Sequence, residues 1–210
     1  MYTLYYSPGA CSMAVHVALN ELGVPYDLKE ISLSKGENRS PEFLKKNPRG
    51  QVPVLEKDGK IYLEGAAILI HLLETHKSPL LPAGGPERDA AIQWLMFCNA
   101  TLHPAFGPLF LQNHLVEKQP EMKNNPVFDI GRKRLQGLWD YVEGHLGQSP
   151  YLAGKSITVG DILLTVFANW ATAFNLNLGP NVKRLVKEVS SCPSYQKALR
   201  TEKVEYKAAA

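Results

Sequence analysis

Cysteine is scarce in this chain. The 210 residues include only three, Cys11, Cys98 and Cys192, which lie far apart in the sequence. An odd number of widely spaced cysteines argues against a disulfide framework and favours a reducing, cytoplasmic compartment. A metal site is not expected either, because His71 and His76 have no companion ligands at usable intervals.

Long apolar runs and strong charge are also missing. No stretch approaches the ~18 uninterrupted apolar residues of a membrane span, and the first residues lack the pattern of a signal peptide. The net charge is +3, and the only tight basic clusters are Lys45-Lys46 and Arg132-Lys133-Arg134. Such clusters are more typical of solvated faces than of nucleic-acid grooves, so neither a membrane nor a nucleic acid is expected as a partner.

The first part of the chain alternates between short apolar runs and segments with apolar residues at helical spacing. This alternation predicts a small α/β domain over residues 1–77. The expected strands are Met1–Tyr6, Asp27–Ile31, Pro53–Glu56 and Lys60–Leu63, with a hairpin turn at Lys57-Asp58-Gly59. The expected helices are Ser12–Leu22, Ser40–Asn47 and Glu64–His76.

Prolines and glycines concentrate between Lys77 and Pro86, which predicts a linker. Beyond it the pattern indicates an all-helical domain over residues 86–210. Thr158 and Asp161 have the spacing of a capping box, and residues 208–210 are expected to be a frayed tail. The expected helices are Glu87–Leu115 (with bends at Pro104 and Pro108), Asn125–Leu146, Thr158–Phe174, Asn181–Ser190 and Pro193–Glu202.

Cys11 is the most informative single residue. It follows an apolar strand and a Ser7-Pro8-Gly9 turn, where a helix is expected to begin. Unpaired N–H groups and the helix dipole at such a position favour the reactive thiolate, although a small buried hydrophobe is the alternative. Dithiol redox proteins carry a second cysteine where this chain has Ala14. A reactive Cys11 would therefore need an external thiol, and glutathione is the obvious candidate.

Five segments together resemble the glutathione transferase family, specifically its bacterial beta class, over nearly the whole length. The resemblance implies a thioredoxin-like N-terminal domain, a helical C-terminal domain, glutathione as co-substrate and a homodimer. The segments are Tyr5–Ser12, Asn47–Leu55, Leu63–Ile68, Leu102–Phe110 and Ile157–Asp161.

The resemblance also implies roles for residues of the first domain. Val52-Pro53 corresponds to the family's cis-proline site, where the Val52 backbone would hold the cysteinyl part of glutathione. Glu64-Gly65 would bind the γ-glutamyl end, the helix N-terminus taking the carboxylate and Glu64 the ammonium. Lys35 and Gln51 are further candidates for binding glutathione. A solvated lysine and a plain helix-opening glutamate are the structural alternatives.

In the second domain, His103 corresponds to a histidine that faces the thiol and could relay a proton. Pro104 stands where beta-class members often carry lysine, and Met96 stands where related chains have asparagine. Asn99 and Thr101 are the nearest polar substitutes on the same helix. The three tryptophans are expected in core or interface packing.

Three functions follow from this pattern. The first is conjugation of glutathione to small hydrophobic electrophiles, a detoxification reaction with Cys11 at the glutathione sulfur and His103 assisting. The second is a glutathione-dependent thiol–disulfide transferase or peroxidase, in which Cys11 forms a mixed disulfide. The third is a ligand-binding or regulatory member of the fold with little catalysis.

Overall fold

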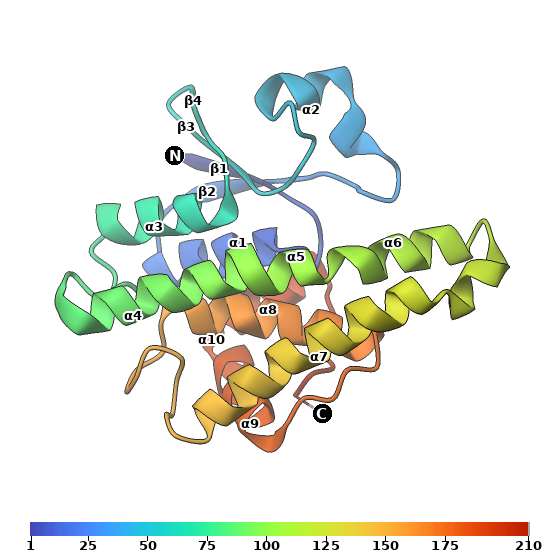
Figure 1. Ribbon diagram of the computed structural model, residues 1–210. Helices are drawn as coiled ribbons and strands as arrows, with labels where there is room; N and C mark the ends of the chain where they lie inside the picture. The colour runs from blue at the N-terminus through green and yellow to red at the C-terminus, as the bar shows by residue number, and fades with distance from the viewer. Residues whose placement is uncertain (210) are drawn as a thin grey trace.

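The computed structural model describes residues 1–209 and shows a small sheet beside a larger bundle of helices (Figure 1). The strand order is β2-β1-β3-β4. Strand β1 runs parallel to β2 and antiparallel to β3, which forms a hairpin with β4. All four strands are predicted by the sequence, and they are β1 (Tyr2–Tyr6), β2 (Tyr26–Glu30), β3 (Val54–Lys57) and β4 (Lys60–Tyr62).

Side chains alternate across the sheet and bury both of its faces. Leu4 and Leu55 belong to the main core, whereas Tyr5 and Val54 pack with Phe43 in a second, smaller core. Figure 1 shows α1 and α3 on one side of the sheet and α2 on the other. These helices are α1 (Ser12–Leu22), α2 (Pro41–Lys46) and α3 (Gly65–Thr75); a short 3₁₀ turn, η1 (Glu37–Arg39), precedes α2.

The expected single helix over Glu87–Leu115 is instead divided. Pro104 and Pro108 have no N–H to donate to the preceding turn, so regular α-helical bonding cannot run through them. The chain widens into a π-helical stretch ahead of Pro104 and starts a new helix with Pro108 in its first turn. The pieces are α4 (Gly85–Met96), η2 (Phe97–Leu102), α5 (His103–Ala105) and α6 (Gly107–Val116).

The remaining helices surround α8, whose residues from Val159 to Ala168 are all buried. The predicted capping box is present, since the Asp161 carboxylate accepts hydrogen bonds from the Thr158 N–H at 2.8 Å and from its hydroxyl at 2.9 Å. The helices are α7 (Pro126–Leu146), α8 (Val159–Ala173), α9 (Pro180–Ser191) and α10 (Pro193–Glu202), with a 3₁₀ turn, η3 (Pro120–Asn124), before α7. Helix α1 packs against α3, α8 and α10, and so joins the sheet to the helical bundle.

The expected frayed tail is wrong for the part of it that the structure describes. Tyr206 donates a hydrogen bond to the Thr165 carbonyl at 2.9 Å, and the Lys207 N–H bonds Asn169 at 2.7 Å. Ala208 is buried as a result. Residue 210, the end of the expected tail, lies outside the described residues.

None of the helices within residues 1–209 is both long and apolar enough to cross a membrane.

Candidate active site

A cavity of about 760 Å³ lies between the sheet-containing part and the helical bundle. Its two walls differ in chemistry, one being largely polar and the other aromatic and apolar. Cys11 stands in the polar wall, and His103 stands in the aromatic one. The polar wall is built from Ser7–Cys11, Asn38-Arg39, Arg49–Pro53 and Glu64-Gly65, and the facing wall includes Asn99, His103, Phe110, Leu163 and Trp170.

Cys11 occupies the start of α1, as the sequence predicts, but its thiol is not activated there. The Sγ atom donates a hydrogen bond to the Val52 carbonyl oxygen at 3.4 Å. Burial raises the pKa of the Cys11 thiol to about 11, and this outweighs the backbone N–H groups of Cys11 and Ser12, which lower it. The N–H groups at the helix start thus favour the thiolate, as the sequence indicates, but burial outweighs them and the thiol is protonated near pH 7.

The hydroxyls of Ser12 and Tyr5 have partners within the protein. Ser12 accepts a hydrogen bond from the Ser7 N–H at 3.2 Å and donates to the Ser7 carbonyl at 3.3 Å, which closes the turn before α1. Tyr5 packs in the smaller core and donates to Glu56 at 2.9 Å. Tyr5 therefore has a packing role, and Ser12 closes the preceding turn without capping α1.

His103 begins α5, directly after the π-helical stretch, and lines the cavity with Asn99. Its ring centroid lies 5.0 Å from that of Phe167 and 5.2 Å from that of Trp170. Burial lowers the pKa of His103, so the imidazole is neutral near pH 7. Among the described residues, no side-chain hydrogen bond to this ring is found. His103 can therefore accept a proton from a molecule in the cavity.

The Val52-Pro53 peptide bond is cis, as the resemblance implies. Both residues line the cavity directly ahead of β3. The Val52 carbonyl faces the Cys11 thiol, so the backbone at this position meets the thiol inside the cavity.

Glu64 precedes α3 in an unusual backbone conformation. Its φ of 68° lies in the left-handed region, which costs a residue with a side chain on the order of 1–3 kcal/mol. The Glu64 side chain makes no capping bond to the helix, and its carboxylate pairs instead with Arg49 at 2.7 Å. The first N–H groups of α3 thus remain without a side-chain cap beside Gly65, which lines the cavity.

The other predicted site residues divide into two groups. Gln51 and Asn99 line the cavity, and Gln51 accepts a hydrogen bond from Arg49. Lys35 lies on an exposed loop and is not part of the lining, because η1 places Asn38 and Arg39 there instead. Thr101 lines a second cavity, between the start of α6 and α7, because residues two positions apart point to opposite sides of a helix.

Sequence reasoning missed several lining residues. Arg49 could have been predicted, because it belongs to the segment Asn47–Leu55 that carries the family resemblance. Arg39 gave no signal, because only the 3₁₀ turn η1 brings it near the Arg49 backbone, where Nη1 donates to the carbonyl at 3.3 Å. Trp170 was expected in core or interface packing, but it lines the cavity and donates through Nε1 to the Gly9 carbonyl at 2.7 Å.

Over residues 1–209 the structure contains no group of three or more histidine, cysteine or acidic side chains arranged to hold a metal ion.

Comparison with known proteins identifies the family. Residues 1–74 match the model of the glutathione S-transferase N-terminal domain, and residues 94–193 match that of its C-terminal domain. Glutathione S-transferase GstA of Escherichia coli is 31% identical over 205 residues, covering 95% of this chain and 98% of that protein.

Two solved structures share the fold over almost the whole length. The glutathione S-transferase of Xylella fastidiosa has a TM-score of 0.86 at 26% identity and covers 98% of this chain and 100% of its own. A sphingomonad glutathione S-transferase, solved in complex with glutathione, has a TM-score of 0.83 at 27% identity, with 97% and 100% coverage. With two family models and a full-length relative in agreement, this chain belongs to the glutathione S-transferase family.

Proposed function

We propose that this protein conjugates glutathione to small hydrophobic electrophiles in the cavity between the sheet and the helical bundle. The observation that carries the proposal is the two-walled cavity with Cys11 on one wall and His103 on the other. A polar tripeptide needs the first wall and an apolar electrophile needs the second.

The polar wall suits the charges of glutathione. The uncapped N-terminus of α3 at Gly65 offers backbone N–H groups and a positive dipole end to the γ-glutamyl carboxylate. Glu64 can take the neighbouring ammonium, while Arg39 and Arg49 supply cations for the remaining carboxylate. The Val52 backbone lines the same cavity and would pair with the cysteinyl part of an extended peptide.

The opposite wall suits an apolar electrophile. Phe110 is 44% exposed and meets Trp170 edge-on at a centroid distance of 5.4 Å. Leu163 adds an aliphatic surface to the same wall. Phe110 thus presents an apolar surface to a molecule in the cavity.

The chemistry requires the glutathione thiol to lose its proton. The neutral imidazole of His103 accepts that proton, and the Cys11 thiol exchanges its hydrogen bond to the Val52 carbonyl for one to the resulting thiolate. The thiolate sulfur then forms a bond to the electrophilic carbon, whose leaving group departs with the electron pair of the broken bond. Cys11 remains unmodified throughout this sequence.

The thiol–disulfide alternative receives less support. Mixed-disulfide formation needs a Cys11 thiolate to attack oxidised glutathione. A thiol whose pKa is raised to about 11 carries little thiolate at pH 7. The Cys11 side chain is therefore better suited to donate a hydrogen bond than to attack.

Our proposal extends to class and assembly. The beta-class pattern around Cys11, a bacterial source and a detoxifying role fit the relatives, two of which are bacterial transferases by name. A homodimer is supported by the second cavity of about 410 Å³, beside which Val127 and Ile130 are exposed. The three free cysteines favour a cytoplasmic location.

Calorimetric titration with glutathione tests the proposal. Glu64→Ala should weaken binding about tenfold, because a charged hydrogen bond to the ligand is lost. Glu56→Ala is the matched control, since Glu56 pairs with Lys46 outside the cavity and its loss should leave affinity within twofold. If millimolar glutathione does not bind the unmodified protein, the proposal fails and the non-catalytic alternative leads.

A further inference from the structure

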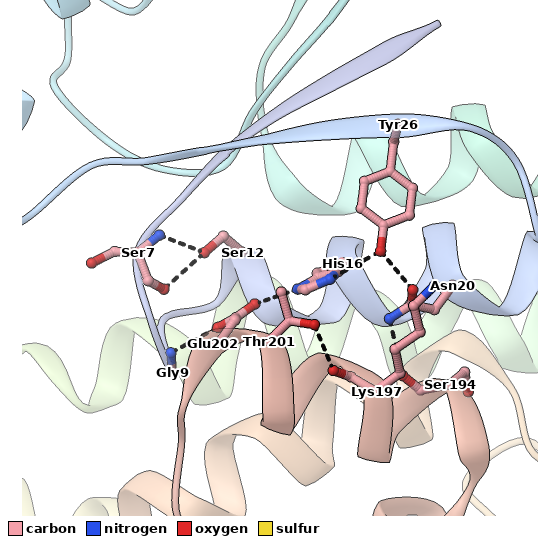
Figure 2. A network of polar contacts seen from close by, with 10 residues as sticks. All are labelled: Ser7, Gly9, Ser12, His16, Asn20, Tyr26, Ser194, Lys197, Thr201 and Glu202. Atoms are coloured by element: carbon pink, nitrogen blue, oxygen red, sulfur yellow. Dashed lines mark hydrogen bonds and ion pairs between the residues drawn. The ribbon is translucent and has the colours of Figure 1, made fainter.

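A buried polar network joins α1, β2 and α10 behind the loop that carries Cys11 (Figure 2). Asn20 determines which atoms of this network donate hydrogen bonds and which accept them. The Asn20 amide nitrogen donates to the Ser194 carbonyl at 3.1 Å, so its oxygen accepts the Tyr26 hydroxyl proton at 2.6 Å. Tyr26 has one hydroxyl proton and donates it to Asn20. Its oxygen can therefore only accept a hydrogen bond from His16 Nε2, 3.1 Å away.

The same reasoning fixes the other end of His16. Its Nδ1 lies 2.7 Å from a Glu202 carboxylate oxygen, and both side chains are fully buried. With Glu202 as a carboxylate, Nδ1 is the donor in this contact. His16 and Glu202 thus form a buried ion pair between α1 and α10.

The second carboxylate oxygen of Glu202 reaches the active-site loop. It accepts a hydrogen bond from the Gly9 N–H at 2.9 Å. Gly9 lines the cavity two residues before Cys11 and has a φ of 68°, a conformation that glycine adopts but does not enforce. Two side chains from the helical bundle hold Gly9, since Glu202 accepts from its N–H and Trp170 donates to its carbonyl at 2.7 Å.

We propose that Glu202 is a positioning residue for the active site. By holding the Gly9 amide, it sets where the turn delivers Cys11 relative to the Val52 carbonyl. The contact with His16 orients the carboxylate so that its second oxygen faces the Gly9 N–H. The inference rests on the proposed function only in naming glutathione as the ligand.

Two readouts on folded protein test the role. One is the alkylation rate of Cys11 by iodoacetamide, mapped by mass spectrometry, and the other is glutathione affinity by calorimetry. Glu202→Met keeps the side-chain length but removes the acceptor. It should speed Cys11 alkylation and weaken glutathione binding, each at least fivefold, because the released loop loosens the contact between the thiol and Val52.

A conservative variant should rescue both readouts. In Glu202→Gln the amide oxygen can accept from Gly9 while the amide nitrogen donates to a neutral His16. The Cys11 alkylation rate and the glutathione affinity should therefore both stay within twofold of the unmodified protein. If Glu202→Gln behaves like Glu202→Met, the hydrogen bond to Gly9 is not what matters and the proposal is overturned.

Glu143→Met is the matched control for general loss of stability. Glu143 also accepts two backbone N–H groups, from Asn181 at 3.1 Å and Val182 at 2.9 Å, but it lies away from the cavity. Its loss should lower the melting temperature while leaving Cys11 alkylation within twofold. An equal acceleration in Glu143→Met would show that destabilisation alone exposes Cys11 and would overturn the proposal.

A double variant covers the case in which Glu202→Met does not fold. His16→Leu combined with Glu202→Met replaces the whole ion pair by apolar groups, an exchange that proteins often tolerate. The proposal predicts the same fast alkylation in this variant, and alkylation at the unmodified rate would contradict it. Should the unmodified protein not bind glutathione, the proposed function falls while the alkylation rates still decide the role of Glu202.

Discussion

His16 and His103 both pack against aromatic rings, yet their ring nitrogens have opposite surroundings. His16 is fully buried, with Glu202 on one nitrogen and Tyr26 on the other. His103 is surrounded by the rings of Phe167 and Trp170, and within residues 1–209 no side-chain hydrogen bond to it is found. One histidine has used its hydrogen-bonding capacity within the protein, and the other has kept it free.

This difference distinguishes residues that hold the fold together from residues that are free to act on a ligand. A buried polar group is stable only when its partners are present, so a satisfied network such as that of His16 holds elements together. An unsatisfied group facing a cavity is suited to a ligand. Cys11 lies between the two cases, since its thiol has the Val52 carbonyl as a partner yet remains in the cavity wall.

The largest effect on stability should come from breaking the His16–Glu202 pair. His16→Leu leaves the Glu202 carboxylate buried without its cation, which should lower the free energy of unfolding by about 3–5 kcal/mol in urea titrations. Adding Glu202→Met should recover at least half of that loss, because the uncompensated charge disappears. Equal instability of the single and double variants would mean that the pair is not an ion pair.

The next effect concerns His103, whose ring nitrogens are free to meet a ligand. His103→Phe keeps an aromatic ring against Phe167 and Trp170 but removes the proton acceptor. We expect kcat/KM for conjugation to fall about tenfold, which corresponds to about 1.4 kcal/mol of barrier. The free energy of unfolding should change by less than about 1 kcal/mol. A large loss of stability with unchanged turnover would reverse the roles assigned to the two histidines.

The smallest effect is a pH dependence of stability. Because burial lowers the pKa of His103, the unfolded chain takes up this proton at a higher pH than the folded one. Stability from this group is therefore complete above the unfolded value of about 6.5 and is lost as pH falls below it, by at most about 1.4 kcal/mol per pH unit. His103→Phe should show a smaller loss than the unmodified protein between pH 7 and pH 5. Identical pH profiles would contradict a neutral His103.

Local sequence patterns predicted much of the fold. The hairpin at Lys57-Asp58-Gly59 and the capping box at Thr158 depend on neighbouring residues, and both are confirmed. The division of Glu87–Leu115 was foreseen only as bends, because proline marks where a helix is disturbed but does not reveal that a π-helical stretch results.

The site was predictable where motif and backbone coincide, and less so where tertiary contacts decide. The cis bond at Val52-Pro53 follows from the segment that carries it. The protonation of Cys11 does not, since its raised pKa comes from burial that no local pattern reveals. Neither does the contact between Glu202 and Gly9, because 193 positions separate the two residues.

The most direct test of the account is to follow the ring nitrogens of His16 and His103 by ¹⁵N NMR while glutathione is added. The account predicts that the His103 signals shift as glutathione fills the cavity, while both His16 nitrogens remain protonated and unchanged. Saturable shifts of His16 with none at His103 would contradict the structural role assigned to His16 and the catalytic role assigned to His103.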